Sequence, residues 1–317
     1  MNINYQYSRL INKLEKRLGK VNLLDSKYLI IKRECKNAPL GLFGYFITNV
    51  AWIEYAIRNN MIPVVDMQNY YNSFHSAQDV GKINTWELFF KQPIEIALEE
   101  ALNSGKARYV WKDIPDYQPN ESLDFLMNPY ILEYYKQIVR TYIKYQPHVL
   151  DILERKNNEI LKNNSNDRVI GVLIRGTDYT QLRPYFHPIQ PNITEVKSKI
   201  DLYRKKYDCK KIYLATEDEG IFIKMKEMYG SDLLYNPQKR VYPSGVYLNE
   251  DKEFNQREPF QKGLEYLQTI YTLSKCNGLV AGRTSGTVGA CLLSNSFEFQ
   301  YIFTLGRYGV EDKILKI

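Results

Sequence analysis

The stretch Val169-Ile-Gly-Val-Leu-Ile-Arg-Gly-Thr-Asp-Tyr179 turns from apolar to polar at a single position, Arg175. An unbroken apolar run is typical of a buried parallel strand, and open α/β sheets bind ligands at the carboxyl ends of such strands. The rigid guanidinium of Arg175 suits a phosphate group. Gly176 lets a ligand approach the backbone, and Asp178 either holds the arginine or accepts a hydrogen bond from a ligand hydroxyl.

The sequence that follows alternates between strands and helices, which is typical of a Rossmann-like domain. Asn192 and Glu195 have the spacing of a capping box at the start of one helix. The polar run 162–168 resembles a linker, so we place this domain at residues 166–317. We expect strands at 211–215, 232–235, 278–281 and 299–305, and helices at 193–207, 217–229, 259–276 and 285–293.

The first half of the chain also begins with a strand, a glycine-containing loop, a helix and a strand. These are predicted at 28–32, 37–46, 47–59 and 61–67, in a Rossmann-like domain spanning residues 1–165. The loop contains Gly41 and Gly44, which either let a sugar approach the backbone or serve a tight turn. Further on, the aromatic segment 84–93 is expected in the core, and the helical region 129–161 is expected to break at Pro147.

Two other predicted strands end in polar residues. The strand at 211–215 leads into Thr216, Glu217 and Asp218, and the strand at 278–281 leads into Gly282-Arg-Thr-Ser-Gly-Thr-Val-Gly289. The amides at the start of the helix after Thr284 form a natural anion site, which together with Arg175 suits a diphosphate. Structural roles are the alternative: Asp218 and either Thr284 or Ser285 as helix caps, and Arg175 as an interdomain ion pair.

A polar stretch without periodicity, residues 236–258, separates the third strand of this domain from the next helix. A loop of this length is usually a lid, a binding loop or a disordered segment. It contains Glu250 and Asp251.

Composition limits the class of protein. The chain has 317 residues, 44% hydrophobic and 25% charged, values typical of a globular protein large enough for two domains. The four cysteines lie far apart, which predicts buried free thiols, and no signal peptide or membrane span is evident, so we expect a cytoplasmic protein. A net charge of +7 fits an anionic ligand or membrane surface, whereas no nucleic-acid motif appears.

Residues 8–20 form a basic amphipathic helix by sequence pattern. Such a helix either packs on the body of the protein with a solvated basic face, which we favour, or makes a peripheral contact with a membrane.

These motifs, in this order, resemble those of the α1,6-fucosyltransferases within the GDP-fucose-dependent fucosyltransferase superfamily. The family carries a His-x-Arg-Arg-Thr-Asp segment followed by Phe-His-Pro-Ile, where this chain has Leu173 to Asp178 and then Phe186 to Ile189. Tyr213 to Asp218 matches the next family motif, and Thr284-Ser285 follows an apolar strand as the family's serine loop does. The Gly41-Leu-Phe-Gly44 loop is similar to that of protein O-fucosyltransferases.

The resemblance implies a GT-B fold: two Rossmann-like domains facing an interdomain cleft. It also implies metal-independent transfer from GDP-fucose without a cofactor. Arg175 would hold the β-phosphate and, with Asp178, act in catalysis; Ser285 would contact the nucleotide. The donor-binding set is Arg175, Gly176, His187, Glu217, Asp218, Thr284, Ser285 and Gly286. The acceptor or lid set is Gly41, Phe43, Gly44, Tyr45, Arg183, Glu250 and Asp251.

The chain departs from the family pattern at four positions. Leu173 replaces the motif histidine, Gly176 replaces the second arginine, and Thr269 lies near the place of the carboxylate that reads guanine. Arg183 stands where the family's proposed general base does, and an arginine is always protonated near neutral pH. Either Asp178, Glu250 or Asp251 then takes the acceptor proton, or the leaving phosphate does.

The predicted function is an inverting glycosyltransferase that moves fucose from GDP-fucose to a glycan hydroxyl in surface polysaccharide or glycolipid synthesis. Its partners would be a nucleotide-sugar donor and a glycan acceptor, with no nucleic acid. Two alternatives are a different nucleotide sugar as donor, and a nucleotide- or glycan-binding protein without catalysis.

Overall fold

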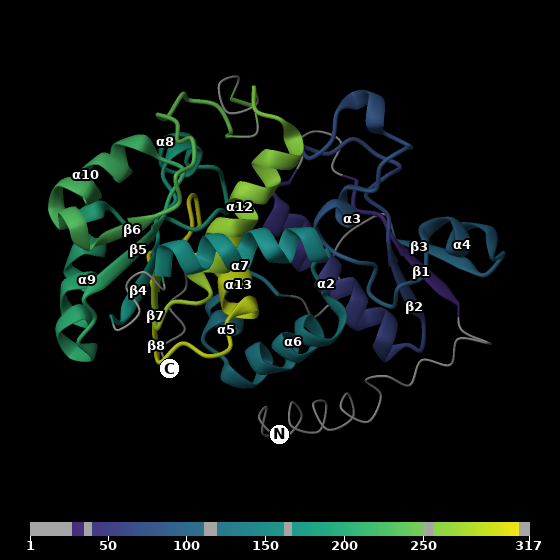
Figure 1. Cartoon of the computed structure of the whole chain (residues 1–317), viewed down its shortest axis with the longest axis horizontal. Coiled ribbons are helices and arrows are strands. Elements are labelled where there is room, and N and C mark those ends of the chain that lie inside the picture. The colour runs from purple at the N-terminus through teal and green to yellow at the C-terminus, as the bar shows by residue number, and fades with distance from the viewer. Residues whose placement is uncertain are drawn as a thin grey trace. The chain divides into compact units, whose positions relative to one another are not determined.

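The computed structural model describes residues 27–34, 40–110, 119–161, 167–248, 250–251 and 256–310. The chain divides into two compact units, Met1–Asp151 and Ile152–Ile317, each with its own parallel sheet (Figure 1). The units meet inside a helix, ahead of the predicted polar linker, most of which lies outside the described residues.

The first unit is built on a three-stranded sheet of order β2-β1-β3, in which every pairing is parallel. Its strands are β1 (Tyr28–Ile31), β2 (Ile62–Val65) and β3 (Ala107–Val110); sequence analysis did not predict β3. The helix α2 (Leu42–Arg58) connects β1 to β2, and α4 (Leu98–Asn103) precedes β3. Because α2 joins β1 to β2 and these two strands pair in parallel, the predicted strand–helix–strand unit is present. Ile30, Ile62 and Val64 of the sheet also pack with Leu98 of α4.

The predicted glycine loop is wrong from Leu42 onward, because α2 begins there instead of at residue 47. Gly41 is the residue before the helix, and the apolar side chains after it recur at helical spacing and become buried. Phe43 and Tyr45 are fully buried within this helix. Burial of these rings stabilises a helical turn that the two glycines alone suggested would be a loop.

The remaining elements in the described part of the first unit are helical. They are η1 (Ala77–Asp79), α3 (Thr85–Phe89), α5 (Leu123–Leu126), α6 (Pro129–Tyr142) and the start of α7 (Pro147–Leu161). Trp86, Phe89 and Phe90 are buried, which confirms the core role expected for the aromatic segment. The helical region breaks before Pro147 as predicted.

The second unit contains a five-stranded parallel sheet of order β6-β5-β4-β7-β8. The strands are β4 (Val169–Leu173), β5 (Lys211–Ala215), β6 (Leu233–Tyr235), β7 (Gly278–Ala281) and β8 (Phe299–Ile302). After β4 the chain builds outward through β5 and β6, then returns to the other side of β4 with β7. The strand order reverses between β4 and β7, and such a switch point is where doubly wound sheets bind ligands.

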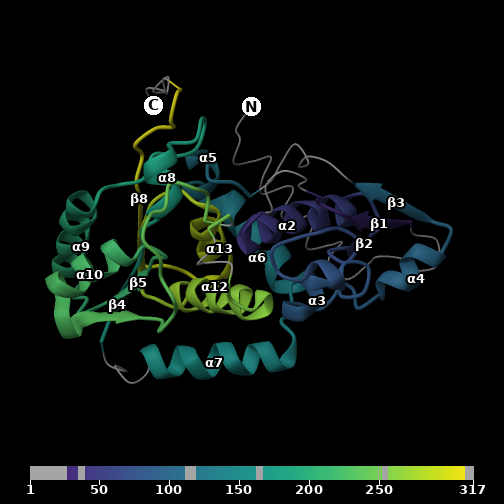
Figure 2. The ribbon, with the colours of Figure 1, turned by 90° about the horizontal axis from the view of Figure 1, so that it is seen from above.

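Helices cover both faces of this sheet, as Figure 2 shows: α9 (Ile193–Tyr207) and α10 (Glu219–Tyr229) on one side, α12 (Pro259–Leu273) and α13 (Ser285–Leu293) on the other. Val196, Ile200 and Met225 pack on the strands from the first side. The predicted capping box at Asn192 and Glu195 is present. A short helix that the sequence did not predict, α8 (Thr177–Leu182), follows β4, and the single turn η3 (Gly230–Asp232) precedes β6.

Cys209, Cys276 and Cys291 are buried free thiols, as predicted; Cys35 lies outside the described residues. Among the helices of the described ranges, none is long and apolar enough to cross a membrane. The basic segment 8–20 also lies outside those ranges, so its proposed membrane contact stays a prediction.

Candidate functional site

Arg175 and Asp178 form a tight pair at the carboxyl end of β4. Nη2 of Arg175 donates to both carboxylate oxygens of Asp178 at 2.9 Å, and Nε donates to Oδ1 at 3.3 Å. Thr177 Oγ1 and the amide of Tyr179 also donate to Oδ1. Of the two roles that the sequence left open for Asp178, these contacts favour holding the arginine.

Asp178 leaves the opposite side of the guanidinium uncommitted: within the described ranges, Nη1 of Arg175 has no hydrogen-bond partner. The Arg175 side chain is 22% exposed and lies over the Tyr179 ring at 4.7 Å. An arginine clamped along one edge and open along the other is oriented to bind an anion.

Glu217, which follows β5, adds a second carboxylate beside Arg175. Its Oε1 lies 3.6 Å from Arg175 Nε and accepts hydrogen bonds from the Gly176 amide at 3.2 Å and from Thr177 Oγ1 at 3.1 Å. Burial raises the pKa of Glu217, and the positive charge of Arg175 opposes that shift. Burial lowers the pKa of Arg175, but Glu217 and Asp178 outweigh it and the pKa is raised, so the guanidinium stays charged.

Asp218 joins the ends of β4 and β5. Its Oδ2 accepts from the amide of Thr177 at 3.0 Å, while its Oδ1 caps α10 by accepting from Ile221 at 2.9 Å. The helix-cap role considered for Asp218 is therefore present, and the same carboxylate fixes the start of α8.

The helix α13 begins beside the same strand end. The amide of Gly282 donates to the carbonyl of Leu173 at 3.3 Å, and a β-carbon built on Gly286 would lie 2.8 Å from the hydroxyl of Tyr266. Burial raises the pKa of Tyr266, and the charge of Arg175 opposes that shift, so this tyrosine is electrostatically coupled to the arginine. The switch point thus brings Arg175, Tyr266 and the first turn of α13 into one neighbourhood.

Thr284 has the cap role that the sequence offered as its alternative. Its Oγ1 accepts from the Thr287 amide at 3.1 Å. Among the described residues, this cap engages one of the first amides of α13, so the turn that starts at the partly exposed Ser285 and continues with the buried Gly286 keeps the partial positive charge of a helix start.

The long polar loop returns to α8 after leaving β6. The amide of Leu248 donates to Asp178 Oδ2 at 3.2 Å, which places this loop at the arginine site. Asp251 is buried and accepts from Ser244 Oγ, whereas Glu250 is exposed. Of the three carboxylates considered as bases, Asp178 and Asp251 are held by protein donors.

His187 and Arg183 lie on the segment after α8. The His187 ring meets the Tyr179 ring edge to face at 5.0 Å, which links His187 to the arginine site through one aromatic contact. Arg183 is exposed and ends α8 in a left-handed conformation, with φ of 46°. Its proposed acceptor role stays a prediction.

The acceptor residues proposed for the first unit have a different setting. Gly41 and Gly44 flank the start of α2, but the rings of Phe43 and Tyr45 point into the core. Their burial leaves no ring surface for a sugar, so core packing is the role that the structure assigns to these two side chains.

Tyr266, Tyr179 and Leu248 were not proposed as site residues from the sequence. Tyr266 lies in the middle of α12, where helical periodicity predicts only packing, and Leu248 acts through its amide, which leaves no sequence signal. In the part of the chain that the structure describes, no group of three or more potential metal ligands occurs.

The fold is that of the GT-B fucosyltransferases. The crystal structure of the fucosyltransferase NodZ from Bradyrhizobium is similar with a TM-score of 0.52, 12% sequence identity, and coverage of 85% of this chain and 94% of that chain. A NodZ α1,6-fucosyltransferase co-crystallised with GDP gives a TM-score of 0.50 at 14% identity, covering 85% and 93%. A second Bradyrhizobium NodZ structure also gives 0.50 at 14% identity, covering 90% and 97%.

No family model matches the chain, and no curated protein sequence matches it. The predicted resemblance to α1,6-fucosyltransferases is therefore confirmed by three-dimensional similarity.

Proposed function

We propose that this chain is an inverting glycosyltransferase that transfers fucose from GDP-fucose to a glycan hydroxyl. One observation carries the proposal: Arg175 is fixed by Asp178 along one edge and lies, with its other edge uncommitted within the described ranges, at the switch point of a doubly wound sheet. A similar structure was crystallised with GDP, a nucleotide diphosphate of the kind this site suits.

The reaction needs positive charge where the diphosphate leaves. The acceptor oxygen attacks the anomeric carbon as the bond from that carbon to the β-phosphate oxygen breaks, so negative charge builds on the diphosphate. Arg175 supplies a full charge and the first turn of α13 supplies oriented amides. No metal ligand set is required in this scheme, which fits the proposed metal independence.

The acceptor proton goes to a side-chain base or to the leaving phosphate. Since Asp178 and Asp251 already accept hydrogen bonds from protein groups, Glu250 is the side-chain candidate with the most exposed carboxylate. We propose a glycan acceptor in surface polysaccharide or glycolipid synthesis, an inference from the class of enzyme and not from particular residues.

A different nucleotide sugar is the second candidate, and one cluster favours keeping it. Thr269 Oγ1 donates to Gln238 Oε1 at 2.6 Å and accepts from Asn236 Nδ2 at 3.0 Å. This neutral amide and hydroxyl cluster occupies the region where the family resemblance leads us to expect a carboxylate that reads guanine. A donor with another base is therefore compatible with the same phosphate site.

The test compares nucleotide binding and sugar release across donors. GDP-fucose, GDP-mannose, UDP-glucose and dTDP-rhamnose are incubated with the wild type, Arg175→Ala, Arg175→Lys and the surface control Arg204→Ala. Loss of one preorganised donor to the diphosphate lowers turnover about 10²–10³-fold, and lysine does not restore it because it lacks the planar fork. Arg204 pairs with Asp232 and donates to the Lys210 carbonyl just before β5, at the amino end of the strands and not at the carboxyl end that carries Arg175, so its variant should match the wild type.

Full activity of Arg175→Ala would remove this arginine from the mechanism. Turnover of another nucleotide sugar without turnover of GDP-fucose would select the second candidate. GDP binding without turnover of any donor would select the non-catalytic binding protein.

A further inference from the structure

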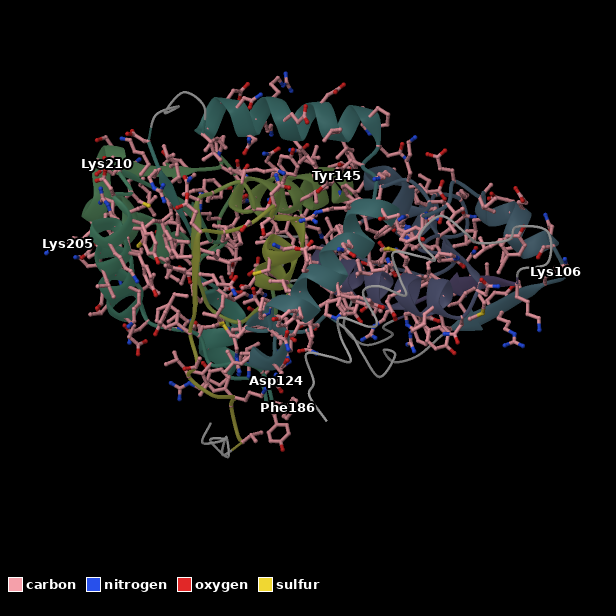
Figure 3. All side chains as sticks on the ribbon, turned by 90° about the horizontal axis from the view of Figure 1, so that it is seen from below. Lys106, Asp124, Tyr145, Phe186, Lys205 and Lys210 are labelled. Atoms are coloured by element: carbon pink, nitrogen blue, oxygen red, sulfur yellow. The ribbon has the colours of Figure 1, made fainter. Side chains whose placement is uncertain are left out.

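Six large apolar side chains are exposed on two segments of the second unit: the end of α8 with the turn that follows it, and the loop after β6. We call them the aromatic rim. They are Leu182 at 36% exposed, Tyr185 at 75%, Phe186 at 55%, Tyr242 at 62%, Val246 at 43% and Tyr247 at 36%. Figure 3 shows Phe186 at the periphery of this unit, away from its sheet. A cluster of exposed apolar side chains of this kind marks an interaction site.

The two segments form one continuous surface. The amide of Leu248, one residue after the rim, donates to Asp178 in α8 at 3.2 Å. A β-carbon on Gly245 would lie 3.9 Å from Oε1 of Gln181, one residue before the rim. These contacts hold the part of the loop from Gly245 to Leu248 against α8, so the two segments adjoin there.

The Tyr185 ring rests against the backbone of Gly309 on one side and is exposed to solvent on the other. Gly309 is left-handed, with φ of 70°, and a β-carbon there would lie 2.7 Å from Cδ2 of Tyr185. Only glycine therefore allows this ring to rest where it does. Despite that support, three quarters of Tyr185 is exposed.

Phe186 is also exposed, and its backbone adopts a rare conformation. Its φ of 68° is rare for a bulky residue. Two hydrogen bonds maintain it: the Phe186 amide donates to the Tyr308 carbonyl at 2.9 Å, and Nη1 of Arg307 donates to the Phe186 carbonyl at 2.8 Å. The Arg307 guanidinium also lies against the Phe186 ring at 4.6 Å, and Phe186 is still 55% exposed. A rare backbone conformation that leaves an aromatic side chain this exposed points to a functional surface.

A chain of ring contacts joins the rim to the phosphate site. The guanidinium of Arg175 lies 4.7 Å from the Tyr179 ring, and the Tyr179 ring meets His187 at 5.0 Å. His187 directly follows Phe186. The rings of Tyr179 and His187 therefore lie between Arg175 and the start of the aromatic rim.

We propose that the aromatic rim binds a pyranose ring of the acceptor, with Tyr185 as the stacking surface. The inference rests on the proposed function: an acceptor must bring a hydroxyl next to the sugar whose diphosphate is at Arg175. The loop that carries part of the rim is bonded to Asp178, the partner of that arginine. Aromatic faces attract the C–H faces of pyranoses, and tyrosine adds a hydroxyl for hydrogen bonding.

Saturation-transfer NMR tests this without knowledge of the natural acceptor, because a ring face stacks on many pyranoses. The probes are methyl β-glucopyranoside and methyl β-galactopyranoside, added to the full chain with saturating GDP. We expect Tyr185→Ser and Tyr242→Ser to raise the Kd of at least one probe about tenfold each, the change that 1.4 kcal/mol produces. Tyr185→Phe keeps the ring and should retain binding, whereas Gly309→Val displaces the ring and should not.

The matched control is Tyr71→Ser, which removes a tyrosine that is 56% exposed in the first unit and should leave the Kd unchanged. GDP titration of every variant reports the donor site separately, and the Kd of each variant for GDP should match that of the wild type. Absence of GDP binding by the wild type would contradict the proposed function and not the rim assignment. Absence of saccharide binding by the wild type would overturn the rim assignment. The rim assignment would also be overturned if the serine variants bound the saccharides as the wild type does but bound phosphatidylglycerol vesicles more weakly. That result would identify a membrane-docking face.

Discussion

A β-carbon placed on Gly176 would lie 2.6 Å from Cβ of Asp218 and overlap its carboxylate. Gly176 has a backbone conformation with negative φ, so the requirement for glycine comes from this close approach between the ends of β4 and β5. The same approach lets Asp218 accept from the amide of Thr177 and orient the turn that carries Arg175 and Asp178. The position where the family has a second arginine therefore has a packing role here.

Gly176→Ser should lower both stability and GDP affinity. Overpacking of this kind costs about 1–3 kcal/mol, and relief of the overlap would move either Asp218 or the turn after β4. Thermal unfolding and GDP titration measure the two effects. Gly41→Ser is the matched control, since a β-carbon there has open space and serine is a favourable helix cap. Equal melting temperatures for the two variants would argue against the contact.

Asp178→Asn should weaken GDP binding, because it removes the charge that clamps Arg175. If Asp178 were instead the base, the rate of transfer would fall with GDP affinity unchanged. Titration of GDP and a steady-state transfer assay on one preparation separate the two outcomes.

Glu250→Gln tests the remaining side-chain base. A general base contributes about 10²–10⁴-fold in rate, so a fall of that size with normal GDP affinity would identify Glu250. Asp251→Asn serves as the comparison, since Asp251 is buried and bonded to Ser244. If both variants turn over at the wild-type rate, proton transfer to the leaving phosphate becomes the better account.

Glu217 should make stability fall as pH rises. Burial raises its folded-state pKa above the ordinary value of 4.5, so the folded state binds more protons than the unfolded state between the two pKa values. Stability is therefore highest below pH 4.5 for this group and is lost as pH rises through the raised pKa. The Glu217→Gln variant has no carboxyl group to titrate at this position. The melting temperature of the variant minus that of the wild type should therefore increase as pH rises across that interval. A difference that is flat from acid to neutral pH would contradict the shift.

Transfer should survive EDTA, because Arg175 and the start of α13 are assigned the diphosphate charge. The assay compares turnover in EDTA with turnover after magnesium or manganese is restored. An absolute metal requirement would show that groups outside this assignment, including residues beyond the described ranges, hold a metal.

The sequence alone determined the strand that matters most and the residues at its end. Every residue from Val169 to Ile174 has an apolar side chain except Gly171, which has none, and this is the pattern of a strand buried on both faces. The pattern depends only on neighbouring residues. The capping box before α9 and the break before Pro147 were predictable for the same reason, since caps and proline act within one turn. The ordered motifs also predicted the fold, which the NodZ similarity confirms.

Only the tertiary structure decided what each of those residues touches. Whether Asp178 holds Arg175 or faces a ligand depends on a side-chain geometry that no spacing encodes, and Tyr266 reaches the site because α12 packs beside β4 and β5. The start of α2 was mispredicted because glycines favour a loop locally, while the burial of Phe43 and Tyr45 favours a helix. The exposed ring of Tyr185 depends on Gly309, which is distant in sequence and supplies the missing β-carbon that makes room for it.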